Sequence, residues 1–162
     1  MPSPRSLPAL AVCLLASLLV PGAGCARLGL GGDDRAPRRD RFAIAGLEEA
    51  QVRVALERLQ RALVAEDADA VAALVSFPLR VGGRRVRTPQ EMARDYRAIW
   101  TPSLQRLVLA QRVEELFVNV QGVMLGDGAV WLGAVCAPGS ARGECRDPQV
   151  RVVAVNPELA RR

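Results

Sequence analysis

The stretch that decides the fold is LFVNVQGVMLGDGAVWLGAV, which runs from Leu116 to Val135. Two apolar runs flank Asp127-Gly128, and Asp-Gly favours the tightest hairpin turn because both central residues of that turn need a positive φ. The sequence therefore predicts a hairpin in which Leu125 faces Val130. Both faces of its strands are mostly apolar, which is typical of strands inside a sheet rather than at its edge.

The segments around this hairpin predict helices and further strands. Apolar residues recur at helical spacing from Val52 to Leu63, with charged residues opposite. The run from Thr88 to Glu91 is a capping box with proline at the first helical position, so it predicts a helix start. Gly82-Gly83 predicts a second hairpin, and Val150 to Val155 predicts a last strand. We therefore expect an α+β fold, with N-terminal helices packed on a curved antiparallel sheet.

The composition restricts the chemistry. The chain has 162 residues, half of them hydrophobic, so it is long enough for one packed domain with appendages and needs no cofactor or metal to fold. All 22 basic residues are arginine, and histidine is absent. The absence of histidine removes the commonest general base and the commonest metal ligand. We expect no catalytic residue of the usual kinds, no cofactor and no metal site.

Residues 1–25 resemble an export signal, with Arg5 before an apolar core of about 14 residues that is too short to remain as a membrane span. Gly22-Ala23-Gly24-Cys25 resembles a bacterial lipobox, although a branched aliphatic residue is usual where Gly22 stands. In that interpretation Cys25 is acylated and anchors the chain to a membrane, the outer one in a Gram-negative cell. The alternative is ordinary cleavage near Ala26, which would leave a soluble periplasmic or secreted protein.

The rest of the chain divides into three parts. Residues 26–45 are rich in Gly, Arg and Asp and predict a flexible tether, residues 46–157 form the domain, and residues 158–162 form a C-terminal tail. In an exported protein, Cys136 and Cys145 are expected to form a disulfide that closes the loop between them. The alternative is two free thiols.

The order of helix, helix, short hairpin, helix and antiparallel strands resembles the nuclear-transport-factor-2-like (NTF2-like, cystatin-like α+β) superfamily. The resemblance covers about residues 46–157 and rests on AEDADAVAALV at 65–75, the helix from Tyr96 to Trp100, and QGVMLGDGAVWL at 121–132. It implies a curved sheet that wraps a long helix and leaves a cone-shaped pocket. This class includes isomerases, dehydratases, ligand binders and non-catalytic domains.

Enzymes of that class place an Asp–His pair or an Asp–Tyr arrangement in the cone, and this chain has no histidine. The polar and aromatic candidates for such a pocket are Asp95, Tyr96, Trp100, Asn119 and Trp131. The simpler interpretation is that the three aromatic residues belong to the core. A basic cluster near the second hairpin is either an anion-binding patch or a solvated strand face, and it comprises Arg80, Arg84, Arg85 and Arg87.

Two functional hypotheses follow from these features. The first is a non-catalytic, lipid-anchored envelope domain that binds a partner protein or an envelope component. The second is a small-molecule binder, or a SnoaL-like isomerase or dehydratase, which uses an Asp/Tyr pocket in the cone. Export and few aromatic residues argue against nucleic acid as a partner. A homodimer is compatible with either hypothesis.

The lipobox interpretation predicts the effect of one substitution. Replacing Cys25 with alanine should abolish fatty-acid incorporation and release the protein from membranes, because the acyl chains supply the anchor. Metabolic labelling with a fatty-acid analogue and membrane fractionation measure both effects. A wild-type protein that never incorporates the label would favour the soluble alternative.

Overall fold

A computed structural model describes residues 40–136, 139, 145 and 147–161. Its helices are η1 (Arg41–Ala45), α1 (Glu49–Val64), α2 (Ala68–Ala73), α3 (Pro89–Arg94), α4 (Tyr96–Ile99), α5 (Pro102–Leu109), η2 (Val113–Glu115) and η3 (Pro157–Arg161), where η marks a 3₁₀-helix. Its strands are β1 (Val75–Val81), β2 (Arg84–Val86), β3 (Phe117–Asn119), β4 (Gly122–Leu125), β5 (Val130–Val135) and β6 (Gln149–Val155). The predicted signal and Cys25 lie outside the described residues.

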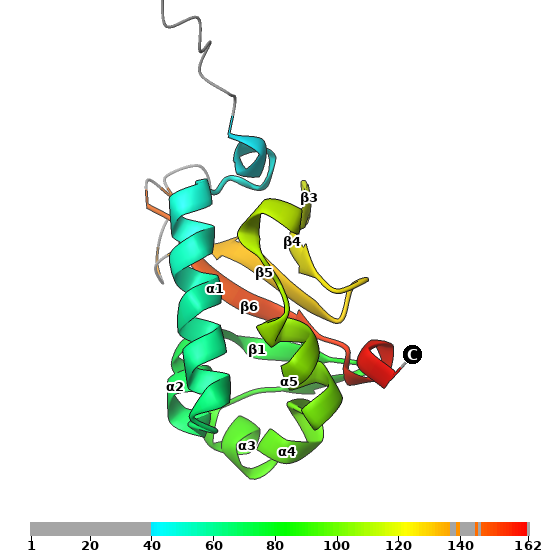
Figure 1. Ribbon diagram of the computed structural model, residues 1–162. Helices are drawn as coiled ribbons and strands as arrows, with labels where there is room; N and C mark the ends of the chain where they lie inside the picture. Colours follow the sequence, from blue (N-terminus) through cyan, green and yellow to red (C-terminus); the bar gives the residue numbers. More distant parts are fainter. Residues whose placement is uncertain (1–39, 137–138, 140–144, 146, 162) are drawn as a thin grey trace, which may run out of the picture. The chain divides into compact units, whose positions relative to one another are not determined.

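The strands form one sheet in the order β2-β1-β6-β5-β4-β3. The α-helices lie on one face of this sheet, and α1 runs across it (Figure 1). The predicted α+β class, with helices packed on a sheet, is therefore confirmed. One pairing differs from the all-antiparallel expectation, because β1 and β6 are parallel. The sequence contains two confirmed hairpins but no local signal for this pairing, which joins strands far apart in the chain.

The central hairpin has the predicted register, since Leu125 pairs with Val130. Asp127 and Gly128 have φ values of +37° and +89°, and Ala129 N donates to Gly126 O at 2.6 Å. The turn therefore has positive φ at both central residues, as Asp-Gly predicts. Its strands β4 and β5 lie inside the sheet, as expected from their apolar faces. A break that the sequence analysis missed separates β3 from β4.

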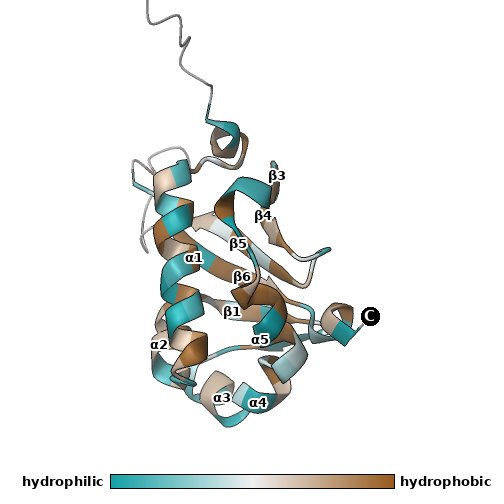
Figure 2. Ribbon diagram, viewed as in Figure 1, coloured by the Kyte–Doolittle hydropathy of each residue, from teal (hydrophilic) through white to brown (hydrophobic). Residues whose placement is uncertain are grey.

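The helix-covered face of the sheet carries the core. A row of cross-strand partners, Val81, Val155, Val130 and Leu125, is almost completely buried. Opposite this row, α1 contributes its apolar side, and Figure 2 shows hydrophobic and hydrophilic residues interleaved along that helix. The segment from α3 to α5 contributes Met92, Ile99, Trp100, Leu104 and Val108, each with no exposed surface. The interior between helices and sheet is thus one continuous apolar cluster.

Side-chain caps fix where two of these helices begin. Thr88 Oγ1 accepts from Glu91 N at 3.1 Å at the start of α3, as the sequence predicts. In a capping box the Glu91 carboxylate would accept from the backbone N of Thr88. Here it accepts instead from the preceding residue, Arg87 N, at 2.8 Å. Thr101 caps α5 in the same way, with Leu104 N as the donor. These caps divide the segment between β2 and β3 into short helices, which turn in succession over the sheet.

The packed domain begins earlier than position 46. Asp40 Oδ1 and Oδ2 accept from Phe42 N at 2.9 Å and from Glu49 N at 2.7 Å, so this carboxylate joins η1 to α1. Phe42 is completely buried. The guanidinium of Arg41 lies over its ring and donates to Leu116 O at 2.8 Å. The last residues of the predicted tether therefore belong to the domain, and residues 26–39 lie outside the described part.

The C-terminal end of the domain is also longer than expected. Residues Pro157–Arg161 form η3, which contains most of the predicted tail 158–162. Leu159 packs against the core, and its side chain approaches Gly128 in the central turn. This contact brings the chain's end against the hairpin on which the fold is built.

Cys136 and Cys145 form a disulfide, with their Cα atoms 5.5 Å apart. Cys136 directly follows β5, and Cys145 precedes β6 by a few residues. The bond therefore ties together the connection between two neighbouring antiparallel strands. The predicted pairing is confirmed.

Gly122 is a position where the backbone admits no side chain. Its φ is +138°, and a Cβ there would lie 2.2 Å from Leu132 O. Gly122→Ala should therefore lower the free energy of unfolding by about 2–4 kcal/mol, measured by urea denaturation. Gly83→Ala is the matched control, because a Cβ at Gly83 has nothing within 4 Å. Equal stability of the two variants would contradict this account.

Candidate functional site

The predicted pocket residues Asp95 and Tyr96 lie at the junction of α3 and α4. The Asp95 carboxylate forms an ion pair with Arg84 at 2.9 Å, and both side chains are partly exposed. Asp95 is therefore directed toward β2 and solvent rather than into the interior. An ion pair with this exposure contributes at most about 1 kcal/mol to stability. It joins one predicted pocket residue to one residue of the predicted basic cluster.

The Tyr96 hydroxyl is buried and has no hydrogen-bond partner among the described residues. Burial raises the pKa of this hydroxyl, and the nearby carboxylates of Glu66 and Asp67 raise it further. Because the hydroxyl has no partner, Asp95 does not form a hydrogen bond with it. Asp95 and Tyr96 therefore do not form the Asp–Tyr arrangement that enzymes of the NTF2-like superfamily place in the cone.

The two tryptophans do not share a cavity, contrary to the sequence-based hypothesis. Trp100 is completely buried on the helix side, and its Nε1 has no partner among the described residues. Trp131 lies on β5 between Val130 and Leu132, which are both buried in the core. Since successive strand residues point to opposite faces, Trp131 is on the helix-free face of the sheet. Trp100 and Tyr96 are thus core residues, as the simpler interpretation expected, whereas that interpretation is wrong for Trp131.

Asn119 belongs to a turn rather than to a pocket. It ends β3, and its Oδ1 accepts from Gln121 N at 2.8 Å. This bond is typical of an Asn side chain that stabilises a turn by accepting from the backbone two residues on. The chain reverses here between β3 and β4, which explains the break inside the stretch that the sequence predicts as one strand.

The basic cluster is divided between the two faces of the β1–β2 hairpin. Arg80 and Arg85 are direct cross-strand partners and are both exposed. Arg84 is directed the other way and pairs with Asp95. Arg87 follows β2 and is exposed. The predicted anion patch is therefore reduced to the side of the hairpin that carries Arg80 and Arg85.

A single row of cross-strand partners crosses the helix-free face through all six strands. It consists of Arg85, Arg80, Ala154, Trp131, Met124 and Phe117, and we call it the outer row. The row is basic at the β2 end and apolar at the β3 end, where Phe117 is 53% exposed. No α-helix in the part of the chain that the structure describes covers this face.

The middle of the outer row is hollowed into a groove of about 360 Å³, the outer groove. It is lined by Arg80, Gly82, Gln121, Trp131, Val153, Ala154 and Asn156. Sequence reasoning singled out Arg80 and Trp131 but missed Gln121 and Asn156, which lie in a turn and after the last strand. The Asn156-Pro157 pair signals only that the strand ends, so local sequence could not place this amide in a groove.

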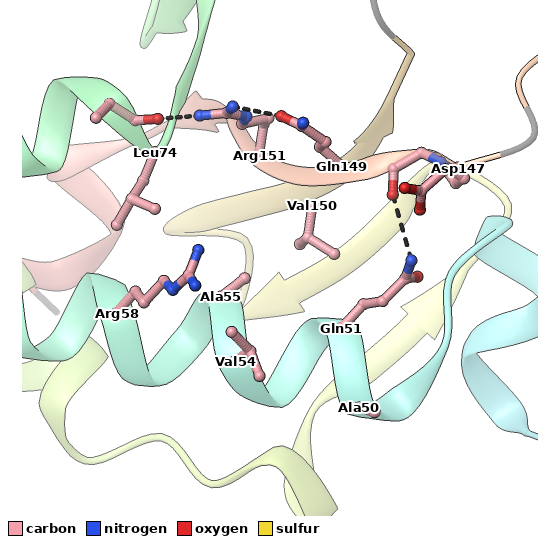
Figure 3. Close-up of a pocket in the computed structure, with 12 residues that line it drawn as sticks. Ala50, Gln51, Val54, Ala55, Arg58, Leu74, Asp147, Gln149, Val150 and Arg151 are labelled. Carbon is pink, nitrogen blue, oxygen red and sulfur yellow. Dashed lines mark hydrogen bonds between the residues drawn. The ribbon is translucent and has the colours of Figure 1, made fainter.

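A second groove, of about 570 Å³, lies between α1 and the start of β6. Figure 3 shows Val54 and Ala55 on the helix and Val150 on the strand, with Gln51 Nε2 donating to Pro148 O at 3.4 Å across one end. Arg151 donates to Ala73 O and to Gln149 at the opposite side. The walls are mostly apolar, and the side chains of Gln51, Gln149 and Arg151 are already hydrogen-bonded. Among the described residues, Arg58 and Asp147 are the lining side chains with charges left for a ligand, so this groove offers few groups for orienting one.

Two general features of the described residues bear on chemistry. They contain no group of three or more His, Cys, Asp or Glu side chains placed to hold a metal ion. Among them, no helix has the length and apolar character needed to cross a membrane.

Comparison with protein-family models, with curated proteins and with solved structures gives no match.

Tyr96 is the only tyrosine of the chain, so its titration can be followed directly. Its pKa is raised in the folded state, so tyrosinate should form above the ordinary pKa of about 10 in the native protein and near that value in urea. Folding favours the neutral hydroxyl over tyrosinate. The free energy of unfolding is therefore unaffected by this group below a pH of about 10 and falls as the pH rises further and the buried hydroxyl has to ionise.

Ultraviolet absorbance of tyrosinate measures both titrations, and Tyr96→Phe should remove the difference in alkaline stability. That variant should otherwise be as stable as the wild type or more so, because it removes an unpartnered hydroxyl. Native titration at the ordinary pKa, or a marked loss of stability in Tyr96→Phe, would contradict the burial of this group.

Proposed function

We propose that this chain is a non-catalytic binding module of the bacterial cell envelope, anchored through Cys25, and that the helix-free face of its sheet is the binding face. The observation that carries this proposal is the contrast between the two faces. The helix side is filled by core side chains such as Trp100. The outer row is accessible and combines aromatic, apolar and cationic side chains, the residue types enriched in binding surfaces.

We also propose that the domain belongs to the NTF2-like superfamily. Support comes from the element order, in which two helices, a hairpin, further helices and antiparallel strands follow one another. The long helix α1 lies across the sheet, as that resemblance implies (Figure 1). A partner protein and an envelope component are both compatible with this fold, because folds of this kind carry many unrelated functions.

The alternative function, an isomerase or dehydratase with an Asp/Tyr pocket, receives less support. Asp95 is engaged with Arg84 on the surface, and the Tyr96 hydroxyl is buried without a partner. A general acid or base must reach the proton that it transfers. Neither side chain lines the outer groove or the groove beside α1.

Site-specific photocrosslinking in intact cells of the producing bacterium tests the proposed binding face. A photoreactive residue in place of Phe117 should give crosslinks to envelope material several-fold more often than one in place of Val64. Val64 is the matched control, because it is 70% exposed and apolar but lies on α1. Asp95→Asn should leave the crosslinks unchanged.

Two outcomes would contradict the proposed function. Crosslinks that are equal at the two positions, or absent at Phe117, would remove the helix-free face as the binding face. Loss of the crosslinks in Asp95→Asn at unchanged stability would favour the enzymatic alternative. The ion pair with Arg84 contributes little to folding, so such a loss would point to a direct role of the carboxylate.

A further inference from the structure

We infer that the outer groove binds an acidic saccharide, with a sugar ring stacked on Trp131 and its carboxylate held by Arg80. This inference rests on the proposed function and names the class of envelope component. It assigns a binding site to the helix-free face of the sheet. This site lies outside the cone in which the NTF2-like superfamily is expected to bind ligands.

The groove results from a small residue between two large ones. Arg80 and Trp131 are both cross-strand partners of Ala154, which lies between them on β6. Neighbouring strands are about 4.8 Å apart, so the Arg80 and Trp131 backbones are separated by about 10 Å across the alanine methyl. The guanidinium and the indole therefore form two walls, and Ala154 forms the floor. The space between these walls suits a single ring of a small ligand.

A bulge widens the floor. The pairing of β5 with β6 skips Val153, since Trp131 pairs with Ala154 while Leu132 pairs with Val152. As a result Val153 and Ala154 both line the groove instead of alternating between faces. Bulges that redirect side chains are common beside binding sites. The volume of about 360 Å³ is at the lower end of the range of about 300–1,000 Å³ for small-molecule sites.

The positive charge at the β1–β2 end of the outer groove favours an anionic ligand. Arg80 and Arg85 lie directly opposite each other, and like charges in that position repel. Neither guanidinium forms an ion pair with any residue that the structure describes, whereas Arg84 on the other side pairs with Asp95. A ligand carboxylate at Arg80 would relieve the repulsion and accept two parallel hydrogen bonds from the guanidinium.

The polar groups around the indole suit hydroxyl groups of a sugar. Asn156 Nδ2 donates to Gly128 O at 2.7 Å, which fixes the amide and leaves Oδ1 as an acceptor for a ligand hydroxyl. Gln121 brings a second amide from the β3–β4 turn. Trp131 offers an apolar face against which the C–H groups of a pyranose ring can pack.

An extended peptide fits this groove less well than a sugar. The groove lies on the face of β1, β6 and β5, and each of these strands has a neighbour on both sides. Peptides that bind by adding a strand need a sheet edge with free backbone groups. Recognition here must therefore come from side chains, and a rigid ring with hydroxyls and one carboxylate matches the side chains present.

The experiment compares two amino sugars that differ in one carboxylate. The full chain, purified in detergent, is titrated with N-acetylmuramic acid and with N-acetylglucosamine, which lacks the acidic side group. Calorimetry should show binding of the acidic sugar at least about tenfold tighter than that of the neutral one, because a guanidinium–carboxylate pair is lost. Added salt should weaken only the acidic sugar's binding.

Tryptophan fluorescence gives a second readout. Trp131 is partly exposed and Trp100 is completely buried, so a change in tryptophan emission on sugar binding reports on Trp131. Trp131→Leu should abolish both the binding and the emission change while keeping an apolar strand residue. Arg80→Gln should weaken binding of N-acetylmuramic acid by about tenfold. Arg94→Gln, which removes an exposed arginine from α3, is the matched control and should bind as the wild type does.

Several results would overturn the acidic-saccharide site. These are equal binding of the two sugars, no binding of N-acetylmuramic acid in the millimolar range, or an unchanged affinity in Arg80→Gln. Tighter binding of a nucleotide would replace the ligand class. A stable homodimer in solution that shields Trp131 from an added quencher would show that a second copy occupies the groove.

The failure of this inference is distinguishable from the failure of the proposed function. Crosslinks from position 117 to a protein, without sugar binding, would remove the saccharide site and keep the binding face. Sugar binding that depends on Arg80, without such crosslinks, would keep the groove as a sugar site and contradict the wider binding face that the proposed function assigns.

Discussion

The alternation of side chains along the central strands is the constraint on which the rest of the structure depends. Val130 and Leu132 are buried beneath the helices, so Trp131 between them must lie on the opposite face. The Asp127-Gly128 turn fixes this register. A shift by one residue would be unfavourable, because it would place Trp131 in the core and Val130 and Leu132 in solvent. The pairings of β5 with β6 and of β6 with β1 then align Ala154 and Arg80 with Trp131 and create the outer groove.

Contacts distant in sequence complete the sheet around that hairpin. The parallel pairing of β1 with β6 brings Arg80 beside Ala154, although the two residues are far apart in the chain. At the two ends of the domain, Asp40 joins η1 to α1, and Leu159 packs beside Gly128. The disulfide ties the connection between β5 and β6. These contacts hold the helix-covered face closed and leave the other face as the accessible surface.

The distribution of polar groups favours ligand binding over proton transfer. The carboxylate of Asp95 forms an ion pair with Arg84 at the surface, and the Tyr96 hydroxyl is buried without a partner among the described residues. The chain also lacks histidine, which removes the side chain that titrates most readily near neutral pH. By contrast, Arg80 and Trp131 are accessible and adjacent to amide groups. Such a set offers charge, stacking and hydrogen bonds to a ligand, which is why we propose binding rather than proton transfer.

The sequence by itself determined the local features, because their causes lie within a few residues. These include the Asp127-Gly128 turn and the Thr88 cap, each confirmed at the predicted residue. Local patterns also paired Cys136 with Cys145 once an exported context was inferred. Only the tertiary structure decided which face each aromatic residue occupies, that β1 joins β6, and that Gln121 and Asn156 meet at one groove. Such placements depend on which strands become neighbours, and no window of sequence contains that information.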